Sequence, residues 1–176
     1  MDADLPEFVP LEEFIAESVD RAAVAKAKTA ALRLLKARDR TPKALADRLK
    51  RKEFDDSVIS HVIARLEAVG LLDERLTAER LVRAELRKAP ASDRLLSMKL
   101  RREGVSDQIA TEVIAEALLD VDLEAVVEVE ARKWLERRPG LERDVAKRRL
   151  AGKFARRGFG GDVVWKVLGR VFDGKD

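Results

Sequence analysis

Cysteine is absent from this 176-residue chain, and histidine occurs only once, at His61. Without cysteine the protein has no disulfide, no reactive thiol and no thiolate ligand for a metal. A single histidine with no cysteine is also too little for a typical zinc site. His61 falls off the apolar stripe of its predicted helix, so we expect a surface residue and no bound metal or cofactor.

Long apolar runs and strand-forming residues are scarce as well. No stretch approaches the roughly 18 apolar residues that identify a membrane-spanning helix, and the N-terminus MDADLPEFVP has no basic start typical of a signal peptide. There is no Tyr, little Thr and only five Pro. Charged residues make up 39% of the chain and are interleaved with Ala and Leu, a composition that favours helices. We therefore expect an all-α, cytoplasmic protein without membrane contact.

Catalytic motifs are equally absent. The chain has no G-x-x-x-x-G-K-[ST] phosphate-binding loop, and the glycine-rich stretch 158–161 follows a basic helix instead of a strand, so it is interpreted as a turn. Asp55 and Asp56 are interpreted as helix-cap residues. Serines such as Ser97 have no neighbouring base to activate them. We expect that the protein is not an enzyme.

The sequence contains an internal repeat in place of such motifs. A set of apolar positions recurs after 51 residues and again after 54 more. Their spacing is that of two consecutive amphipathic helices joined by a turn. The positions are Leu45, Leu49, Phe54, Val58, Val62 and Ile63, then Leu96, Leu100, Val105, Ile109, Val113 and Ile114, then Leu150, Phe154, Phe159, Val163, Val167 and Leu168.

Each copy is predicted to begin with a further long amphipathic helix, so each holds three helices. The predicted first helices cover residues 31–38, 76–88 and 123–137. The predicted organisation is an acidic N-terminal segment, partly disordered or a short helix, over residues 1–28, followed by repeats over 29–73, 74–120 and 121–176. Because a unit of about 50 residues buries little surface, we expect three repeats stacked into an elongated, curved body.

The residues between the helices support this reading. Thr41 precedes a proline and is predicted to cap the second helix of repeat one, as Ser92 does in repeat two. Gly104 and Gly158 occupy the position where a left-handed residue would end the second helix. Repeat one has Glu53 there, a departure that should cost strain. Asp55 and Ser106 are candidate caps of the third helices.

Basic residues also recur in register. On each predicted second helix, three positions that face away from the apolar seam are Lys or Arg in all three repeats. A regular row of cations suits a long, negatively charged partner, although a solvated face kept for solubility would look the same. We call these nine residues the basic row: Lys43, Arg48 and Arg51, then Arg94, Lys99 and Arg102, then Arg148, Lys153 and Arg156.

The net charge of +3 is unevenly distributed: residues 137–157 hold nine basic and two acidic residues. Two tryptophans lie in repeat three. Trp134 follows the apolar stripe of its helix and is predicted to lie in the core. Trp165 aligns with Ser60 and Thr111, which should face solvent, so we consider it as an interface anchor.

With these motifs in place, the chain resembles the RecX family of RecA regulators from about Ala30 to Phe172. The resemblance is carried by Leu-rich motifs in a fixed order, including Arg40-Thr41-x3-Leu45, Gly70-Leu71-Leu72-Asp73, Leu96-x3-Leu100-x3-Gly104-Val105 and Arg157-Gly158-Phe159. Departures fall in the middle repeat, where Leu76 and Thr77 replace the usual aromatic and Ala, and where no Gly precedes the second helix.

The resemblance implies a function and a partner. RecX-like proteins lodge in the groove of the RecA–single-stranded DNA filament and restrain its assembly and activities. We therefore expect a monomeric regulator that binds RecA and the RecA–DNA filament, most simply as an inhibitor, with weak direct contact to DNA. The alternatives are an independent helix-turn-helix-type DNA-binding protein and a small enzyme. The predicted third helices expose Glu112 and Glu116, which would repel phosphate and so disfavour the former.

Overall fold

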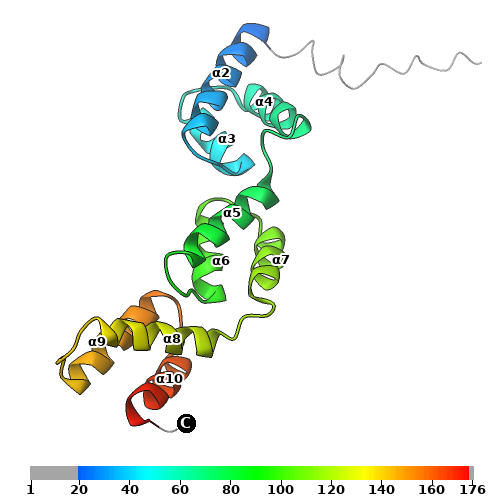
Figure 1. Ribbon diagram of the computed structural model, residues 1–176. Helices are drawn as coiled ribbons and strands as arrows, with labels where there is room; N and C mark the ends of the chain where they lie inside the picture. Colours follow the sequence, from blue (N-terminus) through cyan, green and yellow to red (C-terminus); the bar gives the residue numbers. More distant parts are fainter. Residues whose placement is uncertain (1–19, 175–176) are drawn as a thin grey trace, which may run out of the picture. The chain divides into compact units, whose positions relative to one another are not determined.

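The computed structural model describes residues 20–174, and this part of the chain forms nine α-helices and no strand (Figure 1). The prediction of an all-α protein is therefore confirmed. Most of the expected acidic N-terminal segment, residues 1–19, lies outside the described residues. The chain divides into two compact units after Asp73.

The first unit holds repeat one, with helices α2 (Arg21–Ala37), α3 (Pro42–Lys50) and α4 (Asp56–Ala68). Helix α2 begins earlier than the predicted first helix, so the division expected after residue 28 falls inside it. Asp20 explains the early start because its carboxylate accepts a 2.8 Å hydrogen bond from the Ala22 amide and caps the helix. The Ala-rich first turns of α2 carry little apolar patterning, which is why the sequence did not reveal them.

The second unit holds repeats two and three. Repeat two consists of α5 (Glu74–Leu86), α6 (Asp93–Arg102) and α7 (Asp107–Leu118), and repeat three of α8 (Leu123–Glu136), α9 (Arg143–Arg156) and α10 (Gly161–Asp173). In all three repeats the first helix packs against the third.

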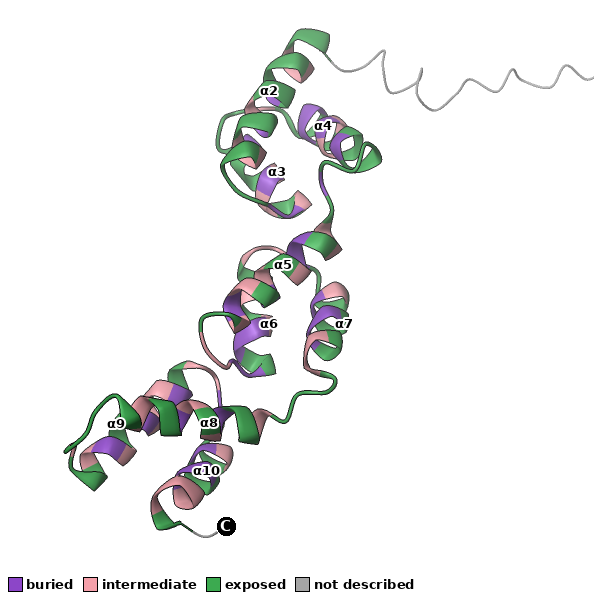
Figure 2. Cartoon of the chain, viewed as in Figure 1, coloured by how far each residue is buried: buried purple, intermediate pink, exposed green. Residues whose placement is uncertain are grey.

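The recurring apolar positions build one small core in each repeat. All of them are buried or half-buried, and Figure 2 shows buried residues on all three helices of each repeat. The residues at the shared second-helix position, Leu49, Leu100 and Phe154, are at most 1% exposed. Burying such a side chain stabilises the fold by about 1.5–3 kcal/mol relative to leaving it in water.

The predicted helix caps are only partly formed. Thr41 and Ser92 accept hydrogen bonds from the backbone amides three residues later, at 3.1 and 3.3 Å. Asp55 and Ser106 occupy the N-cap positions of α4 and α7, but neither side chain accepts a capping hydrogen bond. The Ser106 amide instead donates to the Glu74 carboxylate.

The turn that ends each second helix is left-handed, as predicted. Glu53, Gly104 and Gly158 have φ of 63°, 82° and 85°. Glu53 is the only residue other than glycine with positive φ within residues 20–174. An L-residue in this conformation costs roughly 1–2 kcal/mol, so repeat one carries local strain that the glycines of repeats two and three avoid.

Within the second unit, the turn after α9 joins repeat three to repeat two. The Arg157 guanidinium donates to the carbonyls of Ala89 and Pro90 at 2.7 and 2.8 Å, and the Ser92 amide donates to the Arg157 carbonyl at 3.1 Å. At Gly158 an added Cβ would lie 2.3 Å from the Ser92 hydroxyl. The Arg157-Gly158 pair is therefore a contact between two repeats, which needs both the long guanidinium and the missing side chain.

Candidate functional site

The basic row lies on α3, α6 and α9, the second helix of each repeat. Seven of its nine residues are exposed: two on α3, one at the C-cap of α3, two on α6 and two on α9. Six of these side chains have no hydrogen bond or ion pair to another side chain or to the backbone within residues 20–174, and Arg148 bonds only the Asp144 carbonyl of its own helix, at 3.4 Å. The seven are Lys43, Arg48, Arg51, Arg94, Arg102, Arg148 and Arg156.

Lys99 of the row forms an ion pair with a buried carboxylate of repeat two. Its ammonium lies 2.6 Å from the carboxylate of Glu85, whose side chain is only 6% exposed. Glu85 also pairs with Lys88 at 3.0 Å and with Arg157 of repeat three. Burial works to raise the pKa of Glu85, but hydrogen bonds from Lys99, Arg157 and Lys88 outweigh it and lower the pKa to about 2. Lys99 thus stabilises the ionised form of the buried Glu85 carboxylate.

Lys153 is the second row member with an internal partner. It is half-buried, pairs with Glu130 of α8 and lies 5.8 Å from the centre of the Phe154 ring. The structure therefore divides the predicted row into seven exposed cations and two half-buried, paired ones. The pattern of the second helix alone could not show this, because the partners come from the preceding helix of the same repeat.

Repeat three also contains a basic groove that the sequence did not predict. It has a volume of about 360 Å³ and combines four cations of α9 with an aromatic ring of α8. Trp134 is half-buried against the core of its repeat, as its stripe predicted, but it also lines this groove. The Arg138 guanidinium lies 4.2 Å from the centre of the Trp134 ring. The residues lining the groove are Trp134, Arg148, Arg149, Gly152, Lys153 and Arg156.

The cations and the aromatic ring of this groove can bind anionic groups and flat rings. Guanidinium and ammonium groups bind phosphate or carboxylate, and an accessible tryptophan ring is a surface on which a nucleobase or another guanidinium can stack. Gly152 adds no side chain to the helix surface at this point. The groove can therefore receive an anionic chain, although only one aromatic ring lines it.

The two remaining residues singled out from the sequence lie elsewhere. Trp165 on α10 is 55% exposed, in keeping with the expected solvent-facing position, and its role as an interface anchor stays a prediction. His61 is half-buried beside a groove of repeat one, so the expectation of a simple surface residue was incomplete.

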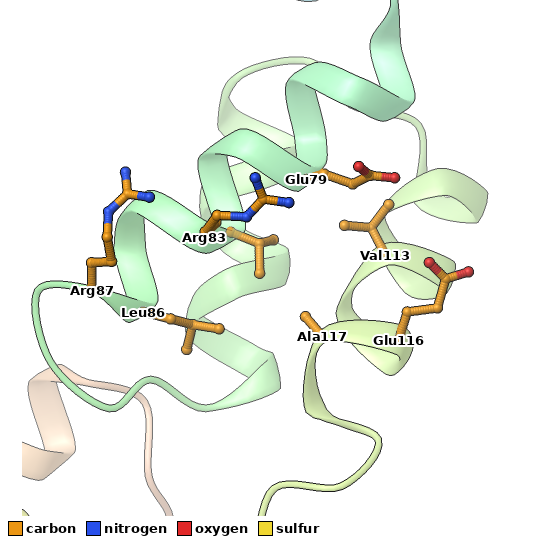
Figure 3. A pocket seen from close by; sticks show the side chains of 8 residues that line it. Glu79, Arg83, Leu86, Arg87, Val113, Glu116 and Ala117 are labelled. Carbon is orange, nitrogen blue, oxygen red and sulfur yellow. The ribbon is translucent and has the colours of Figure 1, made fainter.

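A further groove of about 660 Å³ lies between α5 and α7. Figure 3 shows Glu79 and Arg83 of α5 at this groove, together with Arg87 just after α5 and Glu116 of α7. Its lining has no histidine, serine, threonine or cysteine, so it lacks a nucleophile–base pair. Across residues 20–174 no group of three or more His, Asp or Glu could hold a metal. The helices in that range are too short or too polar to cross a membrane.

Comparison with known proteins identifies the family. A family model described as RecX, first three-helix domain, matches residues 27–66. The chain is 39% identical over 145 residues to the regulatory protein RecX of Mycobacterium sp. (strain KMS), covering 78% of this chain and 76% of that protein. It is 38% identical over 152 residues to regulatory protein RecX of Mycolicibacterium smegmatis, covering 81% and 78%.

The chain belongs to the RecX family. The fold agrees: the crystal structure of RecX from Lactobacillus salivarius superposes with a TM-score of 0.69 over 85% of this chain and 97% of that one, at 21% identity. The predicted family is thus confirmed, and the protein is a regulator of the RecX type. The Arg157-Gly158-Phe159 motif, which helped to reveal the family, is the motif that joins repeats two and three.

Proposed function

We propose that this protein regulates RecA by binding in the groove of the RecA–single-stranded DNA filament, and that it inhibits filament assembly and the recombinase and ATPase activities. The chain's membership of the RecX family supports RecA as the partner. One observation supports the binding surface: seven exposed cations occupy the same helix positions in three successive repeats, and six of them have no partner among the described side chains.

The basic groove of repeat three is the proposed point of direct contact with an anion. Its cations belong to α9, and an anionic partner would gain several charge-assisted hydrogen bonds there. Because only Trp134 accompanies the cations, base stacking contributes little, so we expect weak binding to free single-stranded DNA. Affinity then depends on a partner that engages more than one repeat.

Independent helix-turn-helix DNA binding is disfavoured by the third helices, where a recognition helix would be sought. Glu112 and Glu116 of α7 face Arg75 of α5 and are bonded to it. In repeat three, the α10 cations Lys166 and Arg170 are bonded to Glu124. These polar side chains already have partners within their own repeat, whereas six of the seven exposed cations of the basic row have none among the described residues.

The deciding experiment reverses charge on and off the row. The variant R148E/R156E removes two exposed cations that line the groove of repeat three. The control R33E/K133E makes the same change of net charge at two exposed cations that have no partner among the described residues and lie off the row. Binding to preformed RecA–DNA filaments and to naked single-stranded DNA is measured at low and high salt, with circular dichroism to verify folding.

We expect the row variant to lose at least about tenfold in affinity at low salt, with a smaller loss at high salt because mobile ions screen the interaction. The control should lose little. Equal losses in both variants would show that the row is only a solvated face. If the row variant kept its binding to the filament but lost its binding to naked DNA, the row would contact DNA and not RecA.

A further inference from the structure

Ion pairs join the first and third helices in repeats two and three. Arg75 of α5 donates to Glu112 and Glu116 of α7 at 2.8 and 2.6 Å. In repeat three the arrangement is the same with the signs exchanged: Glu124 of α8 accepts from Lys166 and Arg170 of α10, both at 2.9 Å. The alignment of the buried residues places Arg75 with Glu124, Glu112 with Lys166, and Glu116 with Arg170.

Repeat one has no such pair. The position of Arg75 and Glu124 is taken by Val24 on α2, and the two facing positions on α4 are taken by His61 and Arg65. No ion pair joins α2 to α4, both of which lie wholly within the described residues. Where the other repeats form charged pairs across these two helices, repeat one therefore has a valine facing two basic side chains.

An apolar groove of about 460 Å³ follows the same two helices in repeat one. Its rim exposes large apolar side chains, since Leu32, Val69 and Leu71 are 38%, 59% and 56% exposed. The ionisable residues that line it are Lys28, His61 and Arg65, with no carboxylate. The equivalent groove of repeat two, shown in Figure 3, carries charges of both signs. The groove of repeat one thus suits an occupant that is apolar on one side and negatively charged beside it.

We propose that this groove is an interaction surface for an acidic amphipathic segment, and that its occupant is residues 11–19 of the same chain. Residues 1–19 lie outside the described part of the chain, and their sequence holds six carboxylates and no Lys or Arg. Within them Leu11, Phe14 and Ile15 follow the spacing of one helix face, and Glu12, Glu13 and Glu17 are interleaved with them. Charge and apolarity both complement the groove.

Chain connection favours this occupant over an external one. Residue 19 is followed directly by the cap of α2, and Val24, which lines the groove, lies in the second turn of that helix. From Val24 to Leu32 the helix rises about 12 Å, at 1.5 Å per residue, and nine residues span that distance in a helical or an extended conformation. Tethering also raises the local concentration of the segment to about the millimolar range.

The test uses the absence of cysteine, which makes one introduced thiol unique. In the full chain, Val69→Cys places a thiol on the rim of the groove, and its labelling rate with uncharged N-ethylmaleimide is compared with that of the same protein carrying F14S/I15S. If about nine molecules in ten hold the segment docked, the substitutions should accelerate labelling about tenfold, in proportion to the open fraction. The proton resonances of the single histidine, His61, should shift between the two proteins.

A thiol on α8 provides the matched control. Val129→Cys is similarly exposed but lies in repeat three, so its labelling should be indifferent to F14S/I15S. Equal labelling of Val69→Cys in both backgrounds, with no shift at His61, would overturn the proposal. Slow labelling that disappears on dilution would overturn it too, because a second copy of the chain would then be the occupant.

Discussion

Repeat one and the two repeats that follow it share their helices and their core but differ in the polar contacts between first and third helices. Repeats two and three connect these helices with ion pairs of opposite sign, Arg75 to Glu116 in one and Glu124 to Arg170 in the other. Repeat one has no pair there. The apolar positions therefore suffice to build the three-helix unit, while the polar positions between the same helices can be reversed or lost. The repeats are therefore free to differ at these polar positions while they keep the same fold.

A second difference concerns coupling between repeats. Repeats two and three share the Arg157–Glu85 pair and the close approach of Gly158 to Ser92, and they form one compact unit. Repeat one forms the other unit. Both tryptophans lie in repeat three and the single histidine in repeat one, so fluorescence and histidine resonances follow the two units separately.

The largest expected effect tests whether the units unfold separately. Leu100 is 1% exposed in the core of repeat two, and Leu100→Ala should cost about 2–5 kcal/mol through lost burial and the cavity left behind. Because repeat two is joined to repeat three, tryptophan fluorescence should report this loss in urea unfolding.

The equivalent change in repeat one is Leu49→Ala, at a residue that is fully buried. It should destabilise the signals of His61 and leave the tryptophan transition in place. If Leu49→Ala shifts the tryptophan transition as much as Leu100→Ala does, the two units are one cooperative body and the comparison fails.

The next effect, of intermediate size, concerns the carboxylate that holds repeats two and three together. A pKa of about 2 for Glu85, against an ordinary value of 4.5, is worth roughly 3 kcal/mol of stability at neutral pH. Because the folded-state pKa is depressed, this stability is fully present above about pH 4.5 and is lost as the pH falls toward 2.

Glu85→Gln should therefore weaken the tryptophan-detected transition by roughly 2–3 kcal/mol at pH 7, and its deficit relative to the parent should shrink between pH 4.5 and 2. Glu136→Gln, at an exposed carboxylate of α8, is the control and should show no such convergence. A deficit of Glu85→Gln that is constant with pH would mean that packing, and not charge, gives Glu85 its role.

The sequence predicted those features that depend on periodicity. Apolar spacing located the second and third helices and the residues of each core. The capping and turn residues Thr41, Ser92, Gly104 and Gly158 located the turns. The sequence did not predict contacts between side chains that lie on different helices. Lys99 and Lys153 were indistinguishable from the other row members because their partners, Glu85 and Glu130, lie on a preceding helix. The basic row as a binding surface stays a prediction.

Other features were within reach of the sequence but were not inferred from it. The Arg157-Gly158 motif pointed to the family, but nothing in its spacing indicated that it contacts repeat two, 67 residues away at Pro90. Aligning the first helices as well as the second would have placed Val24 with Arg75 and revealed the missing ion pair. The α2 start was missed because alanine-rich turns are helical without an apolar stripe.

The smallest effect concerns the one turn in which repeat one departs from the others. Glu53 has a φ of 63° where repeats two and three have glycine, and its side chain has no partner within residues 20–174. Glu53→Gly should remove roughly 1–2 kcal/mol of strain, but glycine gives back about 0.5–1 kcal/mol because it frees the unfolded chain. The net gain in the stability of repeat one should be about 0.5–1 kcal/mol, measured from the His61 signals.

Gly158→Ala is the reverse change in repeat three. It should cost more than that gain because the new Cβ would also meet the Ser92 hydroxyl and lie 3.0 Å from the Leu95 Cβ. If Glu53→Gly destabilised repeat one, Glu53 would be making a favourable contact that outweighs its backbone strain, and the comparison between the turns would have to be withdrawn.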